Sequence, residues 1–341
     1  MRAYELRTRI GSLVALASLT FLTGCPSSSS ETPGGEVKAP VSNGAPRKMS
    51  PGCVIPTVET VKSGAYTPLS RPLFLYTSKA ALARPEVAAF LKYYLNEGQK
   101  FVTETGYVAA DESAIENSRK TLAAALAETP EGQALKGEII IDGSSTVFPI
   151  SQAVAEEFQK TNPDVQVPVG ESGTGGGFQK FGRGEIVICD ASRPISDKEK
   201  KACADAGIEY IELTIALDGL TVVVNAENDW CDCLTVSELR KLWESGSTIK
   251  KWSELNPSWP DEEIKLYGAD TKSGTFDYFT EEICKKKGNI RSDYEPSSDD
   301  NTLVKGVAGD KYSLGFFGLA YYIENQSKLK ALGIDPESAA K

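Results

Sequence analysis

Apolar positions follow two different spacings along the chain. Short apolar runs, such as residues 70–77 and 138–142, are typical of strands. Stretches with an apolar residue at every third or fourth position, such as 85–102, 111–127 and 148–160, are typical of helices. Further strands are expected near 165–169, 186–190, 209–213, 219–225, 264–268 and 312–317, and further helices near 235–244 and 275–287. Strands that alternate with helices predict an α/β fold with a largely parallel sheet.

The first 52 residues follow neither spacing. Three arginines precede an apolar stretch at 10–22, and the sequence Leu-Thr-Gly-Cys then ends at Cys25. This order is typical of a bacterial lipoprotein signal peptide at 1–24, so we expect cleavage before Cys25 and a lipid on that cysteine. Residues 25–52 are rich in Ser, Pro and Gly, which predicts a flexible tether. The expected location is extracytoplasmic, at a membrane to which the lipid on Cys25 anchors the protein.

The composition excludes several kinds of chemistry. The 341 residues include no histidine, so Ser-His-Asp and Cys-His relays and His-ligated zinc are excluded. The formal net charge is -10, which argues against nucleic acid as a partner because its binding needs clustered Lys and Arg. The length suffices for two domains. We expect a monomer that is not an enzyme and that needs no cofactor or metal.

Six cysteines remain besides Cys25, an even number that predicts disulfides in an oxidising compartment. The expected pairs are Cys189 with Cys203, which flank one short segment, and Cys233 with Cys284. Cys53 and Cys231 would then pair with each other or stay free.

Three turns rich in glycine and hydroxyl residues, at 143–149, 170–178 and 270–277, each follow an expected strand. A helix that starts at such a turn presents free backbone N–H groups and a partial positive charge, so the turn can hold an anion. Each turn alone equally fits an ordinary helix cap, but three in one chain favour a site. The turn at 170–177 lacks the Lys-Ser/Thr of a nucleotide P-loop. Serine hydrolase activity is also excluded, because the chain has no histidine to activate a serine and this turn does not match the Gly-x-Ser-x-Gly motif.

At these turns the sequence resembles the substrate-binding protein of the high-affinity phosphate ABC transporter. The segments that carry the resemblance are GSSTVFPIS (143–151), GESGTGGGFQKFGRGEI (170–186), CDASRPIS (189–196), DGLTVVVN (218–225), SGTFDYF (273–279) and LGFFGLAYY (314–322). The resemblance implies a two-lobed type II periplasmic binding protein fold, with inorganic phosphate in the interlobe cleft and the permease subunits of an ABC importer as partners.

The order of the segments differs from that of the family. Residues 56–108 resemble a part that, in the family, follows the stretch matching 314–334, so we expect a circular permutant. Residues 129–136 would connect the family's usual ends, and 335–341 would be a tail. Lobe 1 would then comprise 53–128 and 137–226, and lobe 2 would comprise 227–334, with one covalent crossing between the lobes replaced by noncovalent packing. Alternatively, 53–128 is a fused fragment that docks elsewhere.

The resemblance also implies which residues contact phosphate. These are Ser145, Thr146, the amide of Val147, Ser172 and Gly173 from lobe 1, and Ser273, Gly274 and Thr275 from lobe 2. Around 190–193 the candidates are Asp190, Ser192 and Arg193, and Arg193 would supply the positive charge.

Hydrogen phosphate carries a proton that sulfate lacks at neutral pH, so a buried carboxylate distinguishes the two anions. Asp190 and Asp218 are the candidates for this carboxylate, whereas Asp142 and Asp277 are expected to be structural. Two alternatives stay open. The ligand could be another oxyanion such as sulfate, molybdate or arsenate, or the protein could be an extracytoplasmic phosphate sensor or a phosphatase-like protein.

Overall fold

The computed structural model describes residues 52–126, 135–271 and 273–336. The expected signal peptide, the lipidation site Cys25, the tether up to residue 51, most of the connector, Lys272 and residues 337–341 of the tail lie outside the described residues. Within the described residues, no helix is long and apolar enough to cross a membrane.

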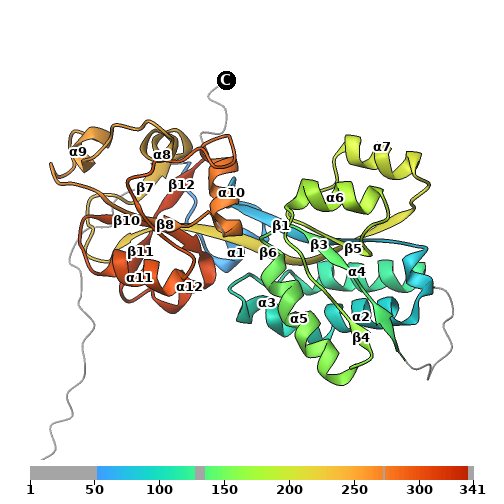
Figure 1. Cartoon of the computed structure of the whole chain (residues 1–341). Coiled ribbons are helices and arrows are strands. Elements are labelled where there is room, and N and C mark those ends of the chain that lie inside the picture. Colours follow the sequence, from blue (N-terminus) through green and yellow to red (C-terminus); the bar gives the residue numbers. More distant parts are fainter. Residues whose placement is uncertain (1–51, 127–134, 272, 337–341) are drawn as a thin grey trace, which may run out of the picture. The chain divides into compact units, whose positions relative to one another are not determined.

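The helices and strands alternate along the described chain (Figure 1). The elements up to the long central strand are α1 (Val58–Lys62), β1 (Ser70–Ser78), the 3-10 helix η1 (Ala81–Ala83), α2 (Pro85–Leu95), η2 (Glu97–Gln99), α3 (Lys100–Glu104), α4 (Glu112–Ala125), β2 (Gly137–Glu138), β3 (Ile141–Gly143), α5 (Phe148–Thr161), β4 (Val165–Gln166), α6 (Thr174–Gly182), β5 (Ile188–Ala191), α7 (Asp197–Asp205) and β6 (Tyr210–Asn225). The elements after it are β7 (Cys233–Thr235), α8 (Val236–Trp243), α9 (Trp252–Leu255), β8 (Lys265–Ala269), α10 (Gly274–Glu282), β9 (Glu295–Ser297), α11 (Asp300–Ala308), β10 (Ser313–Gly318), α12 (Leu319–Glu324), β11 (Leu329–Ala331) and β12 (Gly333–Asp335).

The elements expected from apolar spacing are present, but several differ in extent: the strand expected at 138–142 is divided between β2 and β3, and β4 covers only Val165–Gln166 of the expected 165–169. The strands expected at 209–213 and 219–225 are one continuous strand, β6. Helices α1, α6, α7, α9, α11 and α12 were not expected. The sequence of α6, TGGGFQKFG, contains glycines that disfavour helices. Phe178 and Phe181 of α6 are buried, and this burial outweighs the low helix preference of the glycines.

The main sheet has the strand order β3-β5-β1-β6-β10-β8-β9, and β11 also pairs with β6. Its central strands are antiparallel, because β1 runs opposite to both β5 and β6, and β10 runs opposite to β6. Parallel pairs occur at the flanks, between β3 and β5, β10 and β8, and β8 and β9. The prediction of a largely parallel sheet is therefore wrong at the centre, where β1 is inserted between strands that come later in the sequence.

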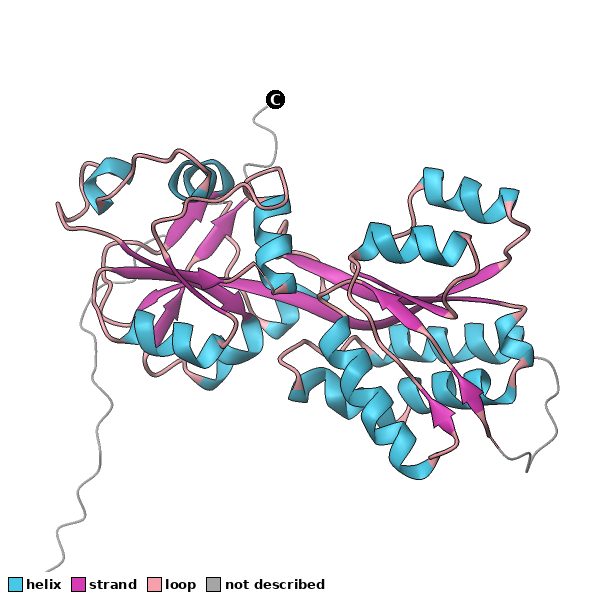
Figure 2. Ribbon diagram, in the orientation of Figure 1, coloured by secondary structure: helices cyan, strands magenta, loops and turns pink. Residues whose placement is uncertain are grey.

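Each half of this sheet is covered by helices on both faces (Figure 2). In β1, Leu73 and Leu75 pack in a cluster with residues of α2, α4 and α5, whereas Phe74 and Tyr76 pack with residues of α6 and α7. This alternation follows from the two-residue period of a strand. We call these two clusters and their elements lobe 1.

The far end of β6 belongs to a second layered unit, lobe 2. Val222 and Val224 pack in a cluster with residues of α8 and α10, and Val223 packs on the opposite face with residues of α11. The two faces of β10 divide in the same way, with Phe316 in the first cluster and Phe317 in the second.

Two strands cross from one lobe to the other. Strand β6 has Leu213 in the core of lobe 1 and Val222 in the core of lobe 2. Strand β1 packs in lobe 1, but Val61 and Leu69, which precede it, are buried in lobe 2. The structure therefore differs from the expected division, because residues 54–69 pack with lobe 2. For the same reason, the predicted loss of one covalent crossing is wrong.

One disulfide joins Cys53 to Cys233, whose Cα atoms lie 6.2 Å apart. Among the described residues, Cys189, Cys203, Cys231 and Cys284 are buried free thiols. The predicted pairs Cys189–Cys203 and Cys233–Cys284 are therefore wrong. The reason is a long-range contact: Val54 pairs with Ile334 of β12, and β12 pairs with β7, so Cys53 is brought to Cys233.

We predict that peptide mapping of the unreduced protein will recover Cys53 crosslinked to Cys233. A C53S/C233S variant should lose about 2–4 kcal/mol of unfolding free energy in urea titrations, because the disulfide closes a long loop of the unfolded chain. A C189S/C203S variant is the matched control and should keep its crosslink. Recovery of a Cys189–Cys203 crosslink would contradict the assignment.

Candidate functional site

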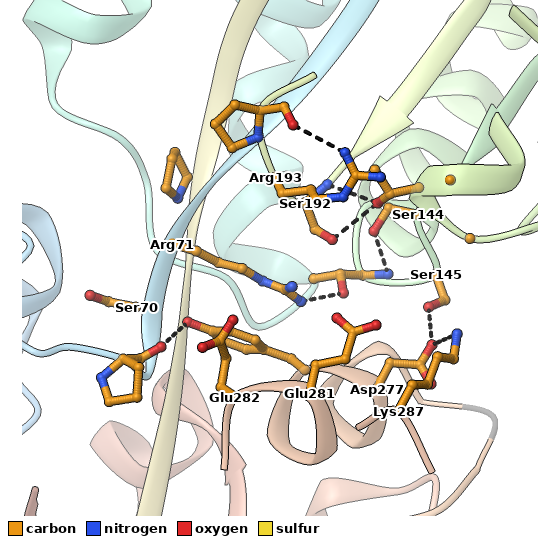
Figure 3. Close-up of a pocket in the computed structure, with 18 of the residues that line it drawn as sticks. Ser70, Arg71, Ser144, Ser145, Ser192, Arg193, Asp277, Glu281, Glu282 and Lys287 are labelled. Carbon is orange, nitrogen blue, oxygen red and sulfur yellow. Dashed lines mark hydrogen bonds and ion pairs between the residues drawn. The ribbon is translucent and has the colours of Figure 1, made fainter. Parts of the chain in front are cut away.

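A polar cleft of about 620 Å³ lies where the crossing strands meet both lobes (Figure 3). Its serine and threonine side chains are those of Thr67, Ser70, Ser144, Ser145, Thr146, Ser172, Thr174 and Ser192. Its charged side chains are those of Arg71, Arg193, Asp277, Glu281, Glu282 and Lys287. Hydroxyl groups and paired charges in a concave site are suited to a small polar ligand.

Arg71 provides the most buried positive charge of the cleft. Its Nε donates to Oδ2 of Asp218 at 3.2 Å, and one terminal nitrogen donates to Oγ1 of Thr146 at 2.9 Å. The guanidinium lies 3.6 Å from the centre of the Tyr278 ring, and the Tyr278 hydroxyl donates to the carbonyl of Pro68. These hydrogen bonds use only part of the guanidinium, so further N–H groups can bind an anion.

Asp218 has a different role from the one expected for it. It is directly opposite Arg71 on the crossing strands and forms the ion pair with it. Burial raises the pKa of Asp218, and the charge and hydrogen bond of Arg71 oppose that shift. The carboxylate therefore neutralises and orients Arg71, and it is absent from the residues that line the cleft.

The turn at 144–146 contributes three hydroxyls from lobe 1. The Ser144 amide donates to the Asp190 carbonyl at 2.9 Å, which fixes the turn to β5. Thr146 accepts the bond from Arg71, and Ser145 donates to Oδ2 of Asp277 at 3.1 Å. The Val147 amide donates to the Ser144 carbonyl at 3.1 Å, so it is already used within the turn and does not fit the contact expected for it.

The second turn presents the start of α6 to the cleft. Gly173 precedes the helix with φ 80°, a conformation that favours glycine, and no side chain caps the helix. The first amides of α6 are therefore open to a ligand. Ser172 is held differently, because its amide and hydroxyl both donate to Asp142, which also binds Lys180. Burial acts to raise the pKa of Asp142, but these hydrogen bonds outweigh it and lower the pKa.

Asp190 lies behind the cleft and does not line it. Its side chain is fully buried, and Ser151 is the neighbouring polar side chain that acts on it. Burial raises the pKa of Asp190 well above its usual range. Its side chain therefore does not fit the expected contact with the anion, although its backbone carbonyl holds the turn at Ser144.

Arg193 lines the cleft, but Glu199 of its own lobe already binds it. Two nitrogens of its guanidinium donate to the two oxygens of Glu199 at 2.9 and 2.8 Å, and its side chain is 44% exposed. Ser192 pairs with Thr174, whose Oγ1 accepts the Ser192 amide at 3.2 Å. Arg71 is therefore better placed than Arg193 to supply the charge of the site.

The third turn contributes residues other than those expected. Ser273, Gly274 and Thr275 are absent from the lining, and Ser273 caps α10 by accepting the Thr275 amide at 3.1 Å. Gly274 packs directly on the backbone of Thr146, so that an added Cβ would lie 2.5 Å from the Thr146 nitrogen. The next turn of α10 faces the cleft instead, with Asp277, Tyr278, Glu281 and Glu282.

Of the twelve predicted site residues, the cleft brings together Ser145, Thr146, Ser172, Gly173, Ser192 and Arg193. Sequence reasoning missed Arg71, Ser144, Thr174 and Lys287, and it assigned Asp277 only a structural role. A single arginine at the start of an apolar strand was the signal for Arg71, but no local motif accompanies it. The structure shows no group of three or more acidic or cysteine residues placed to hold a metal within the described chain.

A polar cleft between two α/β lobes joined by crossing strands defines a two-lobed ligand-binding protein. The family described as a PBP superfamily domain matches residues 128–341, more than half of the chain. The chain belongs to this superfamily.

Individual relatives match a similar share of the chain. "Protein SphX" of Synechococcus elongatus is 49% identical over 215 residues, which are 62% of this chain and 63% of that protein. "Phosphate-binding protein PstS" of Staphylococcus saprophyticus is 45% identical over 203 residues, 60% of this chain and 62% of that protein. The chain thus spans less than two thirds of the length of these curated relatives.

A solved structure of a possible phosphate binding protein from Planctomyces limnophilus is 55% identical to the chain. The match covers 60% of this chain and 72% of that one, with a TM-score of 0.58. This likeness confirms the periplasmic binding protein fold.

We predict that the stability of the protein depends on the protonation of Asp190. Because its pKa is raised in the folded state, the folded protein binds this proton more tightly than the unfolded chain does. Above the pKa of an unfolded aspartate, about 3.9, the contribution of Asp190 to stability should therefore fall as pH rises. Urea unfolding at pH 5 and pH 8 should show D190N gaining stability relative to the wild type at the higher pH. A difference that does not change with pH would contradict a neutral Asp190.

Proposed function

We propose that the protein captures inorganic phosphate in this cleft and delivers it to an ABC-type importer. The observation that carries the proposal is Arg71, a largely buried side chain with unused guanidinium donors, which contacts Thr146 and lines the same cleft as the open start of α6. Phosphate oxygens accept several hydrogen bonds at once, and charge-assisted bonds from arginine are among the strongest that a protein offers.

Two relationships support phosphate as the ligand. The relative from Staphylococcus saprophyticus is named a phosphate-binding protein, and the similar solved structure is described as a possible phosphate binding protein. Binding alone meets this function, so the proposal includes no catalysis and no cofactor. The proposed partners are phosphate and the permease subunits of the importer, with the protein acting as a monomer.

We propose an extracytoplasmic location for the chain. The support is the arrangement of residues 1–24 and the cysteine at position 25, which matches a lipoprotein signal. A lipid on Cys25 would keep the protein at the membrane surface, and residues 26–51 would provide the reach from there to the folded part.

We also propose that the chain is a circular permutant of its family. The family match begins at residue 128, yet the preceding segment supplies β1, which lies between β5 and β6 in the sheet. The ends of the described chain are neighbours, because Val54 and Ile334 exchange backbone hydrogen bonds of 3.0 and 2.9 Å. Residues on either side of the new break in a permuted chain are expected to stay neighbours, because they were joined in the parent fold. The described residues of the lobes would then be 70–126 with 137–217, and 53–69 with 218–271 and 273–334.

We predict that phosphate binding depends on Arg71 more than on Arg193. Replacing the buried pair together, as R71Q/D218N, avoids an unpaired buried charge. Isothermal titration should then show phosphate affinity reduced by about tenfold to a hundredfold, because charge-assisted hydrogen bonds to the anion are lost.

The comparison variant is R193Q, which also removes an arginine that lines the cleft. We expect a change of less than about threefold, because Arg193 is bound to Glu199. A larger loss in R193Q than in R71Q/D218N would contradict the assigned site. Titration of the wild type with sulfate, molybdate and arsenate tests the oxyanion alternative, and silence with every anion would refute the proposed function.

We predict that G274A weakens phosphate binding, since the new Cβ would lie within 2.5 Å of the Thr146 backbone and force the lobes apart there. Alanine favours a helix over glycine by about 1 kcal/mol, so any loss of affinity would come from this contact. G182A in α6 is the matched control, because the nearest atom to its Cβ is 3.8 Å away. Titration should show at least about a tenfold loss for G274A alone. Equal affinities would show that the contact does not affect binding.

A further inference from the structure

Asp277 connects the two lobes across the cleft. It lies in the first turns of α10, and its Oδ2 accepts the hydroxyl of Ser145 from lobe 1 at 3.1 Å (Figure 3). The same oxygen lies 2.7 Å from Nζ of Lys287. The Asp277 side chain is only 18% exposed, so solvent screens these contacts incompletely.

The contact with Ser145 uses a donor that an anion in this cleft would need. A serine hydroxyl carries one proton, so it donates to one acceptor at a time. Here that acceptor is a carboxylate, which resembles a bound oxyanion in both charge and acceptor oxygens. An anion that binds Ser145 must therefore displace Asp277 and then lie beside its negative charge.

Lys287 reduces the repulsion between Asp277 and a bound anion. Its ammonium group neutralises Asp277 and provides a second partner, so the carboxylate is not left unpaired when Ser145 turns to a ligand. Lys287 is itself 55% exposed and lines the cleft, so it can remain with Asp277 after the ligand enters.

We propose that Asp277 is an internal competitor of the bound anion, and that it sets the affinity of the cleft by competing with the anion for the hydroxyl of Ser145. This inference rests on the proposed function, because it takes phosphate as the ligand. The competitor lowers the affinity of the cleft for phosphate and favours its release.

The test is isothermal titration of the full-length protein with inorganic phosphate. D277N removes the charge but keeps the shape of the side chain, and its dissociation constant for phosphate should be about tenfold lower than that of the wild type. K287Q leaves Asp277 uncompensated, so its dissociation constant should be higher. If the ion pair had only a structural role, the dissociation constants of both variants for phosphate would change in the same direction.

E185Q is the matched control, because Glu185 also forms an ion pair, with Arg183, but is absent from the lining of the cleft. It changes the net charge as D277N does and should leave the dissociation constant unchanged. In an S145A background, D277N should improve binding less than in the wild type, because the competition for the hydroxyl is gone.

The outcomes separate this inference from the proposed function. If the wild type binds phosphate but D277N binds equally or more weakly, Asp277 is not a competitor and the proposed function stands. If the folded wild type does not bind phosphate, both are refuted. Should D277N fail to fold in thermal melts, K287Q decides, because unchanged or tighter binding by K287Q overturns the inference.

Discussion

The ion pair between Arg71 and Asp218 is the interaction on which the organisation of the cleft depends. The two residues are direct cross-strand neighbours on β1 and β6, the strands that pass from one lobe to the other. Their side chains are 14% and 7% exposed, so neither charge could remain there without the other. The pair places a positive charge at the junction of the lobes, where lobe 1 offers Thr146 and lobe 2 offers the ring of Tyr278. A ligand bound to Arg71 would therefore contact the strands that connect the two lobes.

Several contacts around this pair span the cleft. Gly274 packs on the backbone of Thr146, and Asp277 accepts the hydroxyl of Ser145. The start of α10 thus lies directly against the turn of lobe 1, and Arg193 and Glu281 line the cleft beside this contact (Figure 3). Small side chains and hydroxyls at this contact allow two backbones to approach closely, which explains why glycine, serine and threonine dominate the turns.

The sequence predicted what depends on local pattern. Strand β1, helices α2, α4 and α5, and the turns at 144–146 and 172–173 all follow from apolar spacing or from helix-start chemistry that neighbouring residues encode. The sequence did not predict contacts between distant segments. Arg71 becomes a cleft residue only because β1 pairs with a strand about 150 positions later, and Cys53 meets Cys233 only because Val54 pairs with β12. Arg193 illustrates the same limit. Ser196 and Glu199 form a capping box whose pattern is visible in the sequence, but the ion pair between Glu199 and Arg193 depends on how the folded chain places the two side chains.

The most direct test of this account is a crystal structure of the protein grown with inorganic phosphate. We predict a phosphate whose oxygens lie within hydrogen-bond distance of the Arg71 guanidinium, the Thr146 hydroxyl and the first amides of α6, with Arg193 still bound to Glu199. A phosphate held by Arg193, with Arg71 contacting only Asp218 and Thr146, would contradict it.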